Sequence, residues 1–311
     1  MFWFWITCIT PILREALSDA VAESVSMRRA SPGAPKLPGA DGCTDRAGLL
    51  RARGMTVPST RNAGLRGRLP KKPPAERFNI QYLSAYLTSP LPAPAYPVDV
   101  TAGITDWEML GNGPDPACTA HPKGVGDCTF AGRQHYRMAK AAAAGETETW
   151  ESPNDLVAEY LKYDHGKDRG ANIADLLLHW YKTGTILAFA PVDHTSPAEV
   201  DSAAAAFHGV YAGVNLTDDA DRLFGQQQPW TTANGEQPNL DDGHCIVKVK
   251  ADGSQYDGWV TWGAVQESTR QWTAACLDEA WVIITQEDAH AANVNLAALR
   301  ADIDALHGQG G

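Results

Sequence analysis

The chain has 311 residues, of which 44% are apolar and 20% are charged, and its formal net charge is −11. This composition is typical of a globular protein with enough apolar material for a core, and it excludes a fibrous or low-complexity chain. Residues 1–77 hold 13 of the 26 basic residues and only 6 of the 37 acidic ones, so the rest of the chain is strongly acidic. An acidic body argues against a nucleic-acid groove and against binding to anionic membranes.

Residues 1–77 are expected to be a disordered or loosely attached extension. Residues 1–13 are apolar, but they are too few to cross a bilayer and lack the basic residues that open a signal peptide. This favours a cytoplasmic protein over a secreted one. Residues 28–77 contain scattered Arg, Gly and Pro without any hydrophobic period, and Met55 is a candidate for the true start.

The first half of the remaining chain has helical signals. Asp127 is a candidate N-cap, and Gly145 is a typical residue after a helix end. Ser152 and Ser196 each stand before a proline, with an acidic residue following, as at the start of a helix. Four helices are therefore expected, at residues 129–144, 153–161, 173–183 and 197–207.

The second half has strand signals and predicts an α+β fold rather than an alternating α/β fold. The expected strands are residues 210–216, 244–249, 258–262 and 280–284, and we expect them to form one antiparallel sheet. Residues 288–307 have apolar side chains at helical spacing, which predicts an amphipathic helix lying on the body or on a partner.

Cys128 stands where a glycine-rich turn runs into the first of these helices. A thiol in the first turn lies among unpaired N–H groups at the positive end of the helix dipole, which favours the thiolate. Cys128 is therefore a candidate nucleophile. The alternative is a small buried thiol that packs the start of the helix, since free cysteine is among the most buried residue types.

Three motifs in order resemble the papain-like cysteine peptidases, most closely the small papain-fold proteins of bacterial and phage genomes. Residues 126–131 (GDCTFA) resemble the motif that carries the nucleophile, and residues 242–247 (DGHCIV) resemble the strand that carries the histidine. Residues 260–263 (VTWG) resemble the Asn-Ser-Trp-Gly segment. The candidate histidine, His244, lies 116 residues after Cys128, and Trp262 lies 18 residues after His244.

The resemblance implies a two-lobed papain-like domain at residues 78–286, followed by a C-terminal helix and tail at residues 287–311. It implies that Cys128 and His244 form a dyad that cleaves a peptide or isopeptide bond through a thioester. The implied partner is a peptide or protein substrate. No cofactor, no nucleic acid and no integral membrane segment are expected. A cytoplasmic or phage-associated location is expected rather than a secreted one. The sequence leaves the oligomeric state open.

The chain departs from the family at two positions. The asparagine that orients the histidine falls at Val260, so Thr261 or an acid such as Asp252 has to replace it. The glutamine that donates to the oxyanion falls at Pro122, with His121 or Lys123 as substitutes. Losing one oxyanion donor costs about 10²–10³ in rate. Besides Cys128 and His244, the candidate site residues are thus Thr261, Trp262, Asp127 and His121.

Two alternatives stay open at this point. The first is a catalytically inactive papain-fold protein with a binding or structural role, for example on a phage or a cell surface, which the replacements at Val260 and Pro122 favour. The second is a metal site formed by Cys118, His121 and Cys128, with a fourth ligand from His244 or Cys245. It lacks the second pair of closely spaced ligands that zinc sites have.

Overall fold

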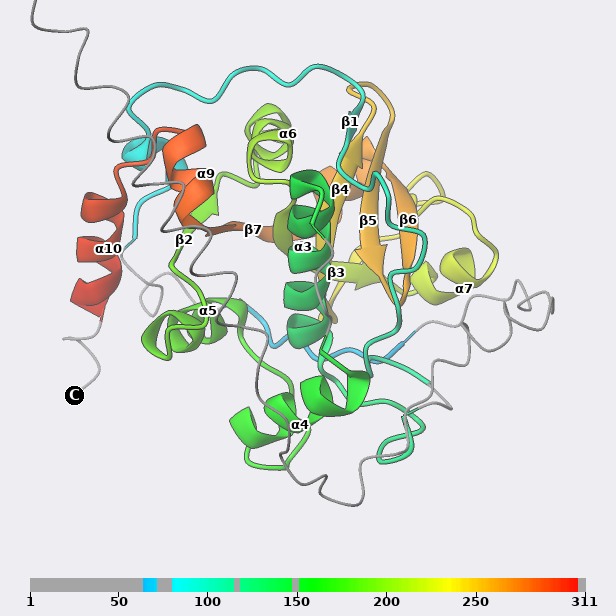
Figure 1. Cartoon of the computed structure of the whole chain (residues 1–311). Helices are drawn as coiled ribbons and strands as arrows, with labels where there is room; N and C mark the ends of the chain where they lie inside the picture. Colours follow the sequence, from blue (N-terminus) through cyan, green and yellow to red (C-terminus); the bar gives the residue numbers. More distant parts are fainter. Residues whose placement is uncertain (1–63, 72–79, 115–117, 147–150, 307–311) are drawn as a thin grey trace, which may run out of the picture. The chain divides into compact units, whose positions relative to one another are not determined.

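The structure, a computed structural model, describes residues 64–71, 80–114, 118–146 and 151–306. Its central element is a seven-stranded sheet in the order β2-β7-β3-β4-β5-β6, with β1 paired to β4 (Figure 1). Every pair of neighbouring strands is antiparallel. The strands are Val98–Asp99 (β1), Ala188–Val192 (β2), Val210–Thr217 (β3), Pro238–Ala251 (β4), Tyr256–Thr261 (β5), Ala264–Thr269 (β6) and Leu277–Ile284 (β7).

Most of the helices precede the long strands, so the expected α+β class is confirmed, as is the antiparallel sheet. The division into two lobes stays a prediction. The helices are η2 (Leu83–Tyr86), α3 (Cys128–Ala144), α4 (Pro153–Tyr163), α5 (Ile173–Lys182), α6 (Pro197–Ala206), α7 (Ala220–Gly225), α8 (Arg270–Cys276), α9 (Gln286–Ala291) and α10 (Leu296–Ala305).

Helix α3 is mostly buried and packs on strands β3 and β4 (Figure 1). Gly132 permits this close approach, because a Cβ there would lie 3.0 Å from both the Cys245 sulfur and the Tyr211 ring. The Tyr211 hydroxyl donates to the Thr129 carbonyl at 2.7 Å. Gly145 ends the helix with φ at 68°, as expected for a glycine in this position.

The two edge strands of the sheet were not predicted from the sequence. Strand β2 contains Pro191, which cannot donate a ladder hydrogen bond and is tolerated at an edge. Strand β6 reads Ala-Val-Gln-Glu-Ser-Thr and is largely polar. The proline of β2 and the polar residues of β6 therefore hide the strand pattern in the sequence, although β2 itself is apolar and mostly buried.

The single helix expected at residues 288–307 is wrong, because the structure has two. Helices α9 and α10 are separated by Asn293, whose φ is 53°, and the side chain of Asn295 accepts from the Ala298 N–H to start α10. The expected packing on the body is confirmed for α10, since Leu299 and Ile303 are fully buried. Residue 307 lies outside the described residues.

The expectation that nothing before residue 78 belongs to the fold is wrong for residues 64–71. Arg68 is 4% exposed, and backbone hydrogen bonds join Leu69 N–H to Ala171 O and Ala171 N–H to Gly67 O, at 2.9 and 2.7 Å. Residues 1–63 and 72–77, with Met55 among them, lie outside the described residues. Among the residues that the structure does describe, no helix combines the length and apolarity required to span a bilayer.

Candidate active site

Cys128 is the first residue of α3, and Asp127 occupies the N-cap. The Asp127 carbonyl accepts from the N–H groups of Phe130 and Ala131, at 2.7 and 3.0 Å. The Asp127 side chain makes no capping bond, unlike the expectation, because its ψ of 20° lies outside the extended region that N-caps normally adopt. Its carboxyl group is fully buried, which raises its pKa well above the ordinary value.

The Cys128 thiol is buried, with 1% of the residue exposed. Burial raises the pKa of this thiol to about 12, while backbone hydrogen bonds from Cys245 and Gly67 and the charge of Arg68 lower it in part. The thiol is therefore protonated at neutral pH in this conformation. The helix dipole alone predicted a thiolate, and desolvation outweighs it.

His244 lies in β4 and is 1% exposed. Its Nε2 lies 2.7 Å from the Thr261 hydroxyl, and its ring stacks on Trp262 with a centroid distance of 4.7 Å and an interplanar angle of 27°. Nδ1 has no hydrogen-bond partner. Burial lowers the pKa of His244 well below its ordinary value, and the neighbouring charges of Arg66 and Arg68 lower it further. The imidazole is therefore neutral.

Thr261 holds the imidazole in place of the asparagine expected at Val260. Val260 is fully buried, and successive residues of a strand face opposite sides, so the next residue, Thr261, points toward His244. Asp252, the other substitute considered, instead accepts from the N–H groups of Ser254 and Gln255 in its own turn, both at 2.7 Å.

No hydrogen bond joins Cys128 to His244. Cys245 faces α3, because its sulfur lies against Gly132, and His244 therefore leaves β4 on the opposite side. His121 and Lys123, the substitutes for the oxyanion donor, lie in a turn where the Gly124 N–H donates to the His121 carbonyl at 2.8 Å. Lys123 is exposed there.

Residues 64–68 cover the thiol and the imidazole. The Leu65 N–H donates to the Asn112 carbonyl at 2.8 Å. Arg66 stacks over Trp262 with its guanidinium carbon 4.9 Å from the ring centroid. Gly67 lies so close to Gly126 that a Cβ there would stand 1.5 Å from the Gly126 oxygen. The Gly67 backbone reaches the Cys128 sulfur, and the charges of Arg66 and Arg68 act on His244, so this covering segment contributes to the burial of both groups.

Arg66 and Arg68 anchor the covering segment to acidic residues of the body. Arg66 pairs with Asp242 at 2.6 Å and with Asp221 at 2.5 Å. Arg68 pairs with Asp278 and Glu279 on β7. Sequence reasoning missed the burial of Arg68 and its pairing with β7, because an arginine in a segment without periodicity gives no signal of burial.

Comparisons with known proteins find similarity in structure but not in sequence. No protein-family model matches the chain, and no curated protein is similar to it in sequence. Among solved structures, the crystal structure of xylellain, a cysteine protease from Xylella fastidiosa, is similar at a TM-score of 0.49 and 14% identity, over 74% of this chain and 99% of that one. This similarity is too low to bear on the chemistry of the present site.

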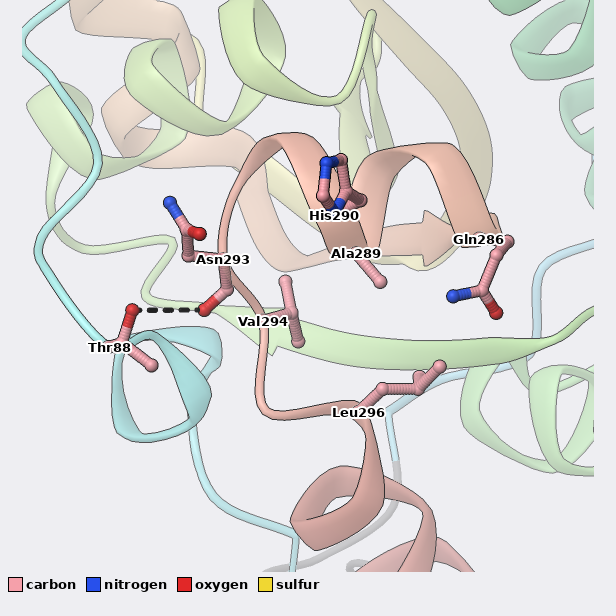
Figure 2. Close-up of a pocket in the computed structure, with 7 residues that line it drawn as sticks. All are labelled: Thr88, Gln286, Ala289, His290, Asn293, Val294 and Leu296. Carbon is pink, nitrogen blue, oxygen red and sulfur yellow. Dashed lines mark hydrogen bonds between the residues drawn. The ribbon is translucent and has the colours of Figure 1, made fainter. Parts of the chain in front are cut away.

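One cavity and the candidate ligand Cys118 involve neither Cys128 nor His244. A cavity of about 340 Å³ opens between α9 and the start of α10, where the Thr88 hydroxyl meets the Asn293 carbonyl at 3.4 Å (Figure 2). Cys118 donates to the Asn154 side chain at 2.9 Å. Throughout residues 64–71, 80–114, 118–146 and 151–306, no three His, Cys, Asp or Glu side chains gather as a metal site would require.

The thiol of Cys128 and the imidazole of His244 are groups of the kind that nucleophilic catalysis uses. The thiol lies at a helix start, where a thiolate is stabilised after water returns. The imidazole is held on one side by Thr261 and Trp262, and its second nitrogen has no partner. In the conformation described, neither group can meet a substrate.

Proposed function

We propose that the chain is a cysteine hydrolase that cleaves a peptide or isopeptide bond, with Cys128 as nucleophile and His244 as general base and acid. The observation that carries this proposal is the way the imidazole is held. Nε2 lies at the Thr261 hydroxyl and Nδ1 is left without a partner, so Nδ1 can take a proton from a thiol once the two groups approach each other. The peptide unit of Cys245, next in the chain, also reaches the Cys128 sulfur.

The reaction begins with transfer of the thiol proton from Cys128 to Nδ1 of His244. The tautomer that can accept it carries its own proton on Nε2 and donates it to Thr261. The thiolate then adds to the carbonyl carbon, and the Cys128 N–H helps to stabilise the oxyanion. Collapse expels the amine, which takes the proton from Nδ1 and leaves a thioester. Water, deprotonated by Nδ1, then releases the acid and restores the thiol.

This chemistry needs a conformation in which residues 64–68 no longer cover the site. Cys128 and His244 are each 1% exposed, so a substrate carbonyl cannot approach. The pKa of about 12 belongs to the covered thiol, because burial is its main cause. Removal of the segment returns water to the sulfur, which lowers the pKa toward the range of reactive cysteines.

A second candidate function is a non-catalytic papain-like protein whose cleft binds a peptide or is only structural. The lack of a Cys128–His244 hydrogen bond favours it, as does Val260 where the asparagine is expected. The two candidates differ in the reactivity of the uncovered thiol.

Alkylation separates the two candidates. We expect the Arg68→Ala chain, treated with iodoacetamide at pH 6–7, to label at Cys128 faster than at Cys118, Cys245 or Cys276, with the sites located by mass spectrometry. Adding His244→Ala should slow Cys128 labelling about tenfold or more, since the base is lost. Equal labelling of Cys128 and these three other thiols would leave only the binding or structural function.

Turnover needs its own test, in the same Arg68→Ala background. Hydrolysis of a mixed peptide pool should be lost with Cys128→Ser. It should fall about tenfold or more with Thr261→Val and return with Thr261→Ser, because the serine hydroxyl can again accept from Nε2. A reactive Cys128 that turns over no peptide would contradict the hydrolase.

A further inference from the structure

Arg68 is the most completely enclosed charge of the covering segment. Its side chain is 0% exposed. Glu279 Oε1 accepts from Nε at 3.0 Å and from Nη2 at 2.8 Å, and Nη2 also pairs with Asp278. Nη1 donates to the Asn215 side chain at 3.2 Å and to the Val214 carbonyl at 3.4 Å. All of these acceptors belong to strands β3 and β7.

The pocket around Arg68 is built by residues of the body. A Cβ at Gly213 would lie 2.3 Å from Arg68 Nε, and one at Gly243 would lie 2.6 Å from the Arg68 carbonyl oxygen. Neither glycine has a positive φ, so the missing side chains provide room rather than a special backbone conformation. Glu279 is fixed by the indole N–H of Trp281, which donates to its second oxygen at 2.9 Å. The pocket is thus shaped before any guanidinium enters.

The backbone beside Arg68 is held as an extended peptide is held by a binding protein. Gly67 O accepts from the Ala171 N–H, and the Leu69 N–H donates to Ala171 O, so the two bonds flank Arg68. The Arg68 and Ala171 backbones form an isolated parallel bridge. Main-chain bonds of this kind combined with a side-chain pocket are the usual means of recognising extended peptides. Gly67 meanwhile lies at the Cys128 sulfur.

We propose that the pocket of Asn215, Asp278 and Glu279 is a specificity pocket that takes an arginine side chain of a peptide substrate, and that Arg68 occupies it in the closed chain. This inference rests on the proposed hydrolase function. An arginine in this pocket places the neighbouring residue of a bound peptide beside Cys128, as Gly67 is placed. A lysine fits less well, because its ammonium is a compact charge. It cannot donate at once to all the acceptors that surround the planar guanidinium of Arg68.

The test uses the full chain with Arg68→Ala and Cys128→Ser, which empties the pocket and prevents turnover. The probes are the blocked peptide Leu-Arg-Gly-Arg-Leu, which copies residues 65–69, and the same peptide with citrulline at its second arginine. Citrulline keeps the shape and removes the charge. By calorimetry we expect the arginine peptide to bind at least about tenfold more tightly.

Two further variants assign that difference to the pocket. Glu279→Gln should abolish the preference for arginine over citrulline. Glu267→Gln, the same change at an exposed position of β6, should leave it intact. Equal affinity for the two peptides, or no binding of either, would overturn the proposal.

A melting experiment keeps the proposal testable if Arg68→Ala is too unstable for calorimetry. The substitution leaves the Glu279 carboxylate without its cation, so ethylguanidinium should raise the melting temperature of this variant. Ethylammonium should not, and neither ion should change the unaltered chain. Identical responses to the two ions would count against the pocket.

Binding and turnover can fail separately. Arginine-selective binding, followed by no peptide hydrolysis when Cys128 is restored, would refute the hydrolase and keep the pocket. Hydrolysis of peptides without enrichment of arginine near the cleaved bond would refute the pocket and keep the hydrolase.

Discussion

Two buried clusters of charge serve different ends in this molecule. In the first, Lys248 of β4 pairs with Asp201 of α6 at 2.6 Å and with Asp257 of β5 at 2.7 Å, and Arg270 of α8 completes the group. In the second, Arg68 pairs with Asp278 and Glu279. The two sets of ion pairs have similar geometry, but only the second joins a segment without regular structure to the body.

The difference shows that burial alone does not assign a charge its role. The partners of the Lys248 cluster lie in regular elements that pack against one another, so the cluster cannot open without loss of the fold. The Arg68 cluster can open by the departure of a few residues, since the pocket itself belongs to strands that stay in place. We therefore regard the Lys248 cluster as part of the structural core and the Arg68 cluster as the contact that keeps the covering segment in place.

The largest expected effect comes from Lys248→Met. This change leaves the carboxylates of Asp201 and Asp257, both 0% exposed, with Arg270 as their remaining cationic partner, so the free energy of unfolding should fall by about 3–5 kcal/mol. Urea denaturation measures it. Lys250→Met is the control: its side chain is 41% exposed, and we expect a change within about 0.5 kcal/mol. Equal effects of the two substitutions would erase the contrast between the clusters.

A smaller effect is expected from Arg68→Ala. Water can reach Glu279 once the segment leaves, so the loss should be about 1–3 kcal/mol. Hydrogen exchange sharpens the comparison, because the amides of Leu65, Leu69 and Ala171 should exchange faster while that of Val247 in β4 stays protected. Uniformly faster exchange over the whole sheet would mean that Arg68, like Lys248, stabilises the fold as a whole.

Truncation of the chain before or after residues 64–68 tests whether this segment stabilises the fold. A chain beginning at Met55 keeps Arg68 and should match the unaltered chain in melting temperature. A chain beginning at Arg77 should melt at a lower temperature, by about 2–6 °C, since it leaves the acidic pocket unpaired. Two equal melting temperatures would mean that the segment contributes no stability.

The pH dependence of Cys128 alkylation is the finest test. In the closed chain the pKa is about 12, so labelling should rise about tenfold per pH unit from pH 7 to 9; with Arg68→Ala the rise should flatten at lower pH. The raised pKa also stabilises the closed fold. That contribution is complete below the unfolded pKa of about 8.5 and is lost as the pH rises toward 12. Superimposable labelling profiles would show that the segment does not control the thiol.

The central parts of the fold could be predicted from the sequence, and its margins could not. The helix at Cys128 and the strand at His244 have apolar patterns set by neighbours on both sides. Strands β2 and β6 lie at the edges of the sheet, where a proline and polar residues are tolerated. The turn at Asn293 that divides the C-terminal helices depends on a positive φ that any single asparagine signals only weakly.

The candidate site was predictable where it is local in sequence. The contact of Thr261 with His244 follows from strand alternation one residue past Val260. Burial of Arg68 depends on Glu279, which lies 211 residues away in the chain. A local sequence pattern cannot predict such a long-range contact. The same contact reverses the expected state of Cys128, because it brings in the segment that removes water from the thiol.

The covalent link between Arg68 and the rest of the chain changes the competition for the acidic pocket. A ligand tied to its own receptor acts at an effective concentration on the order of millimolar, and dilution of the protein does not weaken it. If the segment is away about 1% of the time, a free peptide binds about a hundredfold more weakly than the open pocket allows. Cutting the chain between Arg68 and Cys128 would end that advantage, and the released arginine would then compete as any dissolved peptide does.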